Sequence, residues 1–198
     1  MKLFYSPTSP FVRKVMACAI ARGIDGRIET VRSNPHESPA DLVRANPLSK
    51  VPCLVTDDGM ALFDSPVICE YLDSIGDAPK LFPAAGAARW RALKLQAMGD
   101  GILDAAVLRR GEMGRPKESA RDAFMARQAA AVSRTLDQLE AEPPGGGIDI
   151  GAIAVACALG YLDFRYAAEP WRQGRERLAR WYKEIEATKA IARTAPKE

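Results

Sequence analysis

The sequence predicts a mixed α/β unit followed by an all-helical unit, within a chain of 198 residues. The first eighty or so residues alternate strand-like and helix-like patterns, whereas everything after about Ala85 repeats at helical period only. A Pro- and Gly-rich break at residues 143–147 precedes a run that is apolar on nearly every face. We therefore expect two domains, at residues 1–80 and 86–198.

The first unit reads as strand, helix, strand, connection, two strands and helix. The expected ranges are a strand at 2–5, a helix at 11–23, a strand at 27–33, a connection at 34–49, paired strands within 52–63 and a helix at 65–76. Gly23 ends the first helix, and Asp58-Gly59 favours a tight hairpin turn. A right-handed crossover between the first two strands gives a mixed sheet covered by helices.

The second unit reads as four helices. The expected ranges are about 87–110, 118–140, 152–164 and 175–187. The third is apolar nearly all round, so it must form the core of the helical bundle. Asp149 can cap this helix, but Ala152 occupies the position where a reciprocal capping partner would stand.

Composition narrows the classes of function. The net charge of +3, from 28 basic and 25 acidic residues, is too small to suggest nucleic-acid binding. No stretch reaches the apolar length of a membrane span and no signal-peptide core follows Lys2, so we expect no membrane partner and a cytoplasmic location.

The metal-ligating residue types show no ligand spacing. The four cysteines, Cys18, Cys53, Cys69 and Cys157, form no Cys-x-x-Cys pair and stand among small or apolar neighbours, which predicts buried reduced thiols. His36 lies in a polar run that predicts a loop. The sequence therefore predicts no metal site.

The first helix begins where a thiol redox protein of this layout would carry Cys-Pro-x-Cys, but residues 9–12 read Ser-Pro-Phe-Val. Pro10 suits the first helical position, which makes Ser9 the N-cap. The free N–H groups and the dipole of a helix start stabilise an anion there. A plain structural cap is the alternative interpretation of Ser9.

Two further stretches suggest a ligand. Val51-Pro52 precedes an apolar strand, and a cis bond there would leave the Val51 N–H and C=O free to pair with an extended molecule. Ser65 is the expected N-cap of the next helix, with Pro66 after it and Asp64 before it. The helix start suits a carboxylate and Asp64 suits an ammonium, as in an amino-acid head group.

The motifs YSPTSPFVRKV, NPLSKVPCLV and FDSPVICEYL, in this order before a helical second half, resemble the cytosolic glutathione S-transferases. The similarity covers nearly the whole chain and is greatest to small bacterial members with a serine-type N-terminal motif. The resemblance implies a thioredoxin-like N-terminal domain, an all-α C-terminal domain, a homodimer, glutathione as co-substrate and no metal.

The resemblance also implies roles for individual residues. Ser9 would hydrogen-bond the glutathione sulfur, and Val51 would pair through its backbone with the cysteinyl unit. Asp64 and Ser65 would hold the γ-glutamyl head, and Lys50 would pair with the glycyl carboxylate.

Other assignments stay open. Tyr5, at the end of the first strand, lies where tyrosine-type members keep a catalytic phenol, but we favour Ser9. A hydrophobic electrophile would lie near Phe11 and a helix face containing Leu108 and Arg109. Asp100 and Asp104 lie one turn apart; in some members an Asp of this helix reaches the partner subunit's glutathione, and a surface carboxylate is the alternative.

The implied activity is transfer of glutathione to an alkyl or aryl electrophile, or peroxide reduction, in the service of detoxification. The alternative is a non-catalytic glutathione-binding or scaffold protein of the same fold. A glutathione-dependent thiol reductase is less favoured, since neither Ser9 nor Val12 can form a mixed disulfide.

Overall fold

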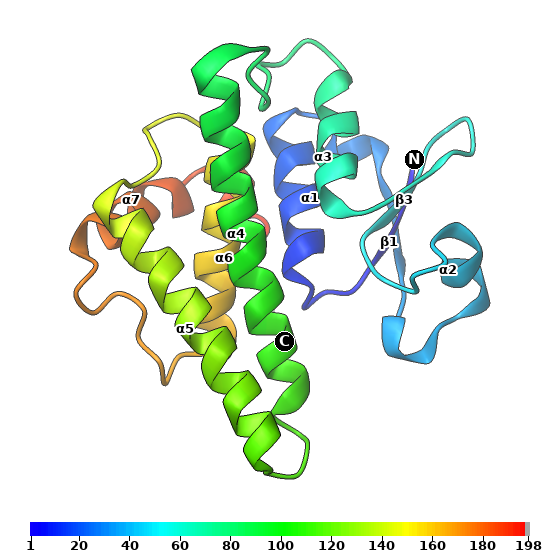
Figure 1. Ribbon diagram of the computed structural model, residues 1–198. Coiled ribbons are helices and arrows are strands. Elements are labelled where there is room, and N and C mark those ends of the chain that lie inside the picture. Colours follow the sequence, from blue (N-terminus) through cyan, green and yellow to red (C-terminus); the bar gives the residue numbers. More distant parts are fainter. Residues whose placement is uncertain (197–198) are drawn as a thin grey trace.

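A computed structural model describes residues 1–196 of the chain. Figure 1 shows a sheet with its helices on one side of the molecule and a bundle of longer helices on the other. The strands all lie before residue 63, and the elements described after Gly86 are helices. The predicted fold class is therefore confirmed, whereas the domain limits at 1–80 and 86–198 stay a prediction.

The sheet has four strands in the order β2-β1-β3-β4. The strands are β1 (Lys2–Tyr5), β2 (Glu29–Arg32), β3 (Cys53–Val55) and β4 (Ala61–Leu62). β1 runs parallel to β2 and antiparallel to β3, so one residue such as Phe4 lies between Val31 and Cys53. The β3–β4 hairpin turns through Gly59, whose φ of +89° favours glycine. The expected mixed sheet is present.

Helices cover both faces of this sheet (Figure 1). The first half contains α1 (Pro10–Ala21), α2 (Ala40–Ala45) and α3 (Ser65–Ser74), with 3-10 turns η1 (Asp25–Arg27) and η2 (Pro35–Glu37). α1 and α3 share the main apolar core with Leu3 and Leu54. On the other face, Leu42 of α2 packs with Phe4 and Cys53. The sequence predicted only a connection where α2 lies, because Leu42 is the one buried residue of this helix.

The second half is a helical bundle. Its helices are α4 (Gly86–Glu112), α5 (Ser119–Ala141), α6 (Ile150–Arg165), α7 (Glu176–Glu186) and α8 (Lys189–Ala192), of which the four-residue α8 was not predicted. Every residue of α6 from 150 to 162 is buried, so the expected core helix is confirmed. α4 lies so close to α6 that a Cβ on Gly99 would come within 2.6 Å of the Ala154 carbonyl carbon.

The start of α6 has the predicted cap. Asp149 is extended, and its Oδ1 accepts a hydrogen bond of 2.8 Å from the Ala152 N–H. Ala152 has no polar side-chain atom, so the second hydrogen bond of a reciprocal capping pair is absent, as expected from the sequence. The cap therefore satisfies one of the free N–H groups at the start of the central helix.

One polar connection ties the two halves together, and a second holds the segment between them. Lys14 of α1, fully buried, donates to both carboxylate oxygens of Asp100 on α4 at 2.6 and 2.7 Å. Arg22, 2% exposed, donates to carbonyl groups between Ile75 and Pro79, and Asp73 accepts from the Leu81 N–H at 2.7 Å. The segment between the halves is thus held by hydrogen bonds at several points.

The cysteines and the histidine lie as the sequence suggested. The four cysteines are buried and free, and burial raises the pKa of Cys53 and of Cys157 to about 11. His36 is exposed in η2. Within residues 1–196, no helix combines the length and apolar character needed to cross a bilayer.

Candidate functional site

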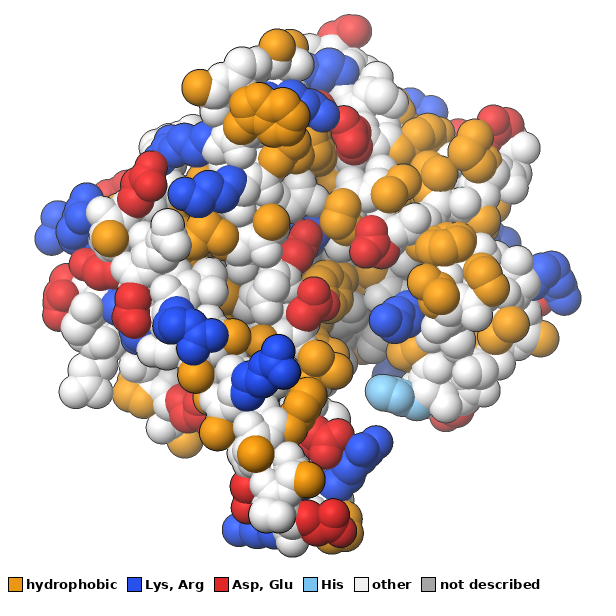
Figure 2. Space-filling view, viewed as in Figure 1, with side chains coloured by type: hydrophobic (Ala, Val, Ile, Leu, Met, Phe, Trp, Pro, Cys, Tyr) orange, Lys and Arg blue, Asp and Glu red, His pale blue; other side chains and the backbone are white. Residues whose placement is uncertain are grey.

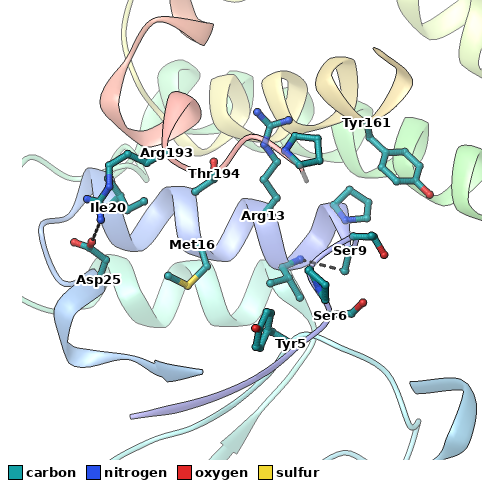
Figure 3. A pocket seen from close by; sticks show the side chains of 15 residues that line it. Tyr5, Ser6, Ser9, Arg13, Met16, Ile20, Asp25, Tyr161, Arg193 and Thr194 are labelled. Carbon is teal, nitrogen blue, oxygen red and sulfur yellow. Dashed lines mark hydrogen bonds and ion pairs between the residues drawn. The ribbon is translucent and has the colours of Figure 1, made fainter. Parts of the chain in front are cut away.

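A cavity of about 400 Å³ runs along one side of α1 (Figure 3). It lies between the loop after β1, α6 and the C-terminal segment. Its walls include Tyr5, Ser6, Thr8, Ser9, Arg13, Met16, Asp25, Tyr161, Arg193 and Thr194. Polar side chains from both halves of the chain thus face one cavity of a size that suits a small molecule.

Ser9 lies at the start of α1, as predicted. Its backbone is extended, its carbonyl accepts from the Arg13 N–H at 3.1 Å, and its Oγ accepts from the Val12 N–H at 3.3 Å. Pro10 follows as the first helical residue. The predicted N-cap is therefore confirmed.

The cap leaves the Ser9 hydroxyl able to bind an anion. A hydroxyl has one proton to donate and two acceptor lone pairs. The Val12 N–H occupies one lone pair of Ser9, so its proton remains available to an acceptor in the cavity. The dipole of α1 favours negative charge at the same place. The structural and the functional interpretation of Ser9 are therefore compatible.

Tyr5, the alternative residue, lines the same cavity. It ends β1 and is partly buried against the main core. In Figure 3 the Tyr5 and Ser9 side chains approach the cavity from different parts of the β1–α1 segment. Because Tyr5 and Ser9 line the same cavity, variants of the two residues decide which of them contacts the ligand's sulfur.

The Val51-Pro52 bond is cis, as the sequence suggested. Val51 precedes the paired residues of β3, which begin at Cys53. Asn46, 1% exposed, holds this turn by donating to the Lys50 carbonyl at 2.9 Å and accepting from the Leu48 N–H at 3.0 Å. Sequence reasoning missed Asn46, although an Asn before a proline in a connection is a turn signal.

The start of α3 differs from the prediction. Asp64, not Ser65, is the N-cap residue, because Asp64 is extended and its carbonyl accepts from the Ile68 N–H at 3.0 Å. Ser65 is already helical and only 2% exposed. The Asp64 side chain makes no capping hydrogen bond and is exposed. Of the two residues, Asp64 is therefore the one whose side chain is open to a ligand.

Acidic side chains gather near the middle of the face seen in Figure 2, between the half that contains the sheet and the helical bundle. Burial raises the pKa of Asp104, the nearby Asp100 raises it further and the charge of Lys50 lowers it. Asp64 also raises the pKa of Asp104 by repulsion. Lys50, Asp64, Asp100 and Asp104 therefore share one region. Asp100 is not a free surface carboxylate, since it pairs with Lys14.

The residues expected around an electrophile lie in different surroundings in the structure. Arg109 is 7% exposed, pairs with Glu169 at 2.6 Å and lies 4.6 Å from the Tyr166 ring centre. It lines a separate cavity of about 230 Å³ beside α5, because its face of α4 turns into the bundle. Leu108 is 51% exposed and Phe11 packs against the core. The Ser9 cavity is not lined by any of the three.

Sequence reasoning missed the residues that line the cavity opposite Ser9. Tyr161 comes from α6, where an apolar pattern on every face gives no hint of which residue borders a cavity. Arg13 lies four residues after Ser9, so helical spacing would have placed it on the same side of α1. Among residues 1–196, no cluster of three His, Cys, Asp or Glu side chains could hold a metal.

Comparison with known proteins gives the family. Residues 8–75 match the family described as glutathione S-transferase, N-terminal domain, and residues 122–184 match glutathione S-transferase, C-terminal domain. The "Uncharacterized GST-like protein YibF" of Escherichia coli K12 is 36% identical, over 99% of this chain and 98% of that protein.

Comparison with solved structures supports the same family. A glutathione transferase family member from Pseudomonas fluorescens Pf-5, with bound glutathione, is 42% identical with a TM-score of 0.95, over 100% of this chain and 99% of that chain. A second structure from this source, with bound S-(propanoic acid)-glutathione, is 42% identical with a TM-score of 0.90, over 100% of both chains. The chain belongs to the glutathione S-transferase family.

Proposed function

We propose that the protein is a glutathione transferase that stabilises the thiolate of glutathione at Ser9 for attack on an electrophilic small molecule. The observation that carries the proposal is the Ser9 hydroxyl, whose proton remains free to donate while its oxygen caps α1. Peroxide reduction uses the same activated thiolate and is the second reaction to test.

Glutathione would extend from Ser9 along the first half of the chain. The Val51 backbone would pair with its cysteinyl unit, and Asp64 and Ser65 would receive the γ-glutamyl head. The exposed Asp64 carboxylate would face the ammonium, and the buried Ser65 would act through its backbone N–H at the start of α3. Lys50 would pair with the glycyl carboxylate. The glutathione and the glutathione conjugate bound in the two relatives from Pseudomonas fluorescens support glutathione as the ligand of this chain.

The thiol of glutathione must lose its proton before it can react as a nucleophile. A free thiol has a pKa of about 8.5, and only its thiolate is a strong nucleophile. A hydrogen bond from Ser9 and the positive end of α1 favour the charged form, so more of the bound thiol ionises at neutral pH. The thiolate then forms a C–S bond, and the leaving group departs with its electron pair.

Calorimetric titration with glutathione, followed by conjugation assays with an aryl halide and an organic peroxide, tests the proposal. We expect Ser9→Ala to lower kcat/KM by about 10- to 1,000-fold, as the loss of a donor to a developing or bound anion does. Thr8→Ala, in the same cavity wall, is the matched control and retains activity.

Three results would change the assignment. Full activity in Ser9→Ala with loss in Tyr5→Phe would transfer the role to Tyr5. Glutathione binding with no turnover of any acceptor would favour the non-catalytic binding protein. No binding at millimolar glutathione would exclude every glutathione-dependent function, including the thiol reductase.

The assembly and location of the protein belong to the same proposal. We expect a homodimer in the cytoplasm with a role in detoxification. Trp90 on α4 is 68% exposed and Val67 on α3 is 46% exposed, which is consistent with a surface that a second copy covers. Sedimentation equilibrium gives the oligomeric state directly.

A further inference from the structure

Arg13 carries a buried positive charge that has no anionic partner within residues 1–196. It lies one helical turn after Ser9 on α1 and lines the same cavity. Arg13 is 8% exposed, and its Nε and Nη1 atoms have no hydrogen-bond partner in the described part of the chain. Its Nη2 donates one long hydrogen bond, of 3.4 Å, to the Ile191 carbonyl. Removing a guanidinium from water in this way costs free energy, which the approach of an anion offsets.

The groups packed around the Arg13 guanidinium are neutral. Its side chain extends from α1 toward the helices of the second half (Figure 3). A Cβ on Gly160 of α6 would lie 2.1 Å from Arg13 Nη1 and 2.8 Å from the Tyr182 hydroxyl, so a phenol of α7 lies beside the guanidinium. Burial raises the pKa of Tyr182 to about 12 and that of Cys157 to about 11, so neither is an anion at neutral pH. The carboxylates that act on Tyr182 are exposed or paired: Glu186, and Asp163 with Arg172.

The other charges near the cavity are balanced. Asp25 lines the far end of the cavity, but Arg193 pairs with that carboxylate at 3.0 Å. Lys14, the neighbour of Arg13 on α1, pairs with Asp100 at 2.6 Å. Of the charged residues that line the cavity, Arg13 is therefore the one without a partner of opposite charge within residues 1–196.

The free charge of Arg13 acts at the place where Ser9 would hold a thiolate. Residues four apart on a helix lie on one side of it, with their Cβ atoms about 5–6 Å apart. The protein around a buried guanidinium screens its charge less than water does, so the positive potential extends along α1. The dipole of α1 has the same sign at the helix start. An effect of this kind requires no contact between Arg13 and the ligand.

We propose that Arg13 is the fixed positive charge that stabilises a thiolate held at Ser9. It is a positioning residue that acts through space, in addition to the hydrogen bond from Ser9 and the dipole of α1. The inference rests on the proposed function, since the thiolate in question is that of glutathione. The alternative is a purely structural role, in which Arg13 only joins α1 to α8 through the Ile191 carbonyl.

A thiol introduced at the start of α1 measures this charge without glutathione. Ser9→Cys places the thiol at the N-cap, and the four native cysteines are buried, so the introduced thiol is the one open to a reagent. The rate of its alkylation by iodoacetamide as a function of pH gives its pKa, which should lie below about 8.5. Adding Arg13→Met, which keeps an apolar stem and removes the charge, should raise that pKa by about 1.

Further variants separate charge from shape. Arg13→Lys keeps a positive charge and should retain most of the effect. Arg180→Met removes an exposed charge on α7 and should leave the pKa of the introduced thiol unchanged. If Arg13→Met does not fold, Arg13→Gln replaces it, because glutamine is neutral and can still donate to the Ile191 carbonyl. A pKa no higher in Arg13→Met than in Arg180→Met, or a pKa as high in Arg13→Lys as in Arg13→Met, would overturn the inference.

Glutathione itself separates this inference from the proposed function. With Ser9 intact, Arg13→Met should raise the pKa of the bound glutathione thiol by about 1 and lower kcat at saturating glutathione by up to about tenfold below that pKa, with little loss above it. If the introduced thiol responds to Arg13 but glutathione is neither bound nor turned over, the proposed function fails and the charge effect at the start of α1 is supported. If glutathione is turned over but neither thiol responds to Arg13, the inference is overturned and the transferase remains.

Discussion

The Lys14–Asp100 pair makes a prediction about stability that two single variants and their combination test. The Lys14 side chain is fully buried and that of Asp100 is 16% exposed, with the two charges 2.6 Å apart. Burial raises the pKa of Asp100 even though Lys14 lowers it, so desolvation outweighs the ion pair at this carboxylate. Asp100 can thus escape an unpaired charge by taking up a proton.

Replacing either partner should therefore have unequal effects. Asp100→Leu leaves a buried ammonium with no partner, which costs about 3–5 kcal/mol of unfolding free energy. Lys14→Met should cost about 1–3 kcal/mol, because the remaining carboxylate can be neutralised. The variant with both changes should come within about 1–2 kcal/mol of the wild type, since no charge is left buried.

The penalty of Lys14→Met should also depend on pH. Without Lys14, the pKa of Asp100 rises further, so the variant is penalised above that pKa and relieved as pH falls through it. Urea unfolding between pH 8 and pH 5, followed by the fluorescence of the buried Trp171 and Trp181 at constant protein concentration, measures this. A combined variant as unstable as the sum of the single ones, or a Lys14→Met penalty that grows toward pH 5, would refute the reasoning.

Three further predictions concern packing, capping and a buried thiol. Gly99→Ala should cost about 1–3 kcal/mol because its Cβ meets the Ala154 backbone, whereas Gly101→Ala on the same helix has open space and should stabilise by about 0.5–1 kcal/mol; equal effects in urea unfolding would contradict this. Asp149→Ala should cost about 1 kcal/mol by removing the cap of α6, and an unchanged unfolding midpoint would show that the cap contributes nothing. The pKa of Cys157 is raised from 9.0 to about 11, so the stability that its neutral thiol contributes is complete below pH 9 and lost as pH rises through 11. Between pH 9 and pH 11, the unfolding free energy should fall less steeply with pH in Cys157→Ala than in the wild type, by the slope that corresponds to about one proton. An unchanged slope would contradict this.

Much of the fold follows from local patterns in the sequence. Ser9-Pro10 and Gly23 mark the limits of α1 within one or two residues, because a cap, a fixed φ and a left-handed glycine are local properties. α2 was not predicted from the sequence. This short helix is stabilised by the packing of Leu42 on the sheet, which is a contact between residues distant in sequence. α8 has only four residues, which are too few to show a helical period in the sequence.

The candidate site was predictable only where it consists of loops and helix starts. Ser9, Val51 and Asp64 stand at such positions, and prolines next to them or close by identify these positions in the sequence. Arg109 lines a different cavity from Ser9, which the sequence could not show because it does not say which face of a long helix turns toward which neighbour, and α4 packs on both α5 and α6. Tyr161 could not be found for the same reason.

The pKa of the glutathione thiol in the complex is the measurement that tests the role of Ser9 most directly. Ultraviolet difference absorbance of the thiolate, recorded as a function of pH at saturating glutathione, reports it without any assumption about the electrophile. The account predicts a pKa below about 8.5 in the wild type and a rise toward that value in Ser9→Ala, with Thr8→Ala unchanged. The same pKa in the wild type and in Ser9→Ala would contradict the account.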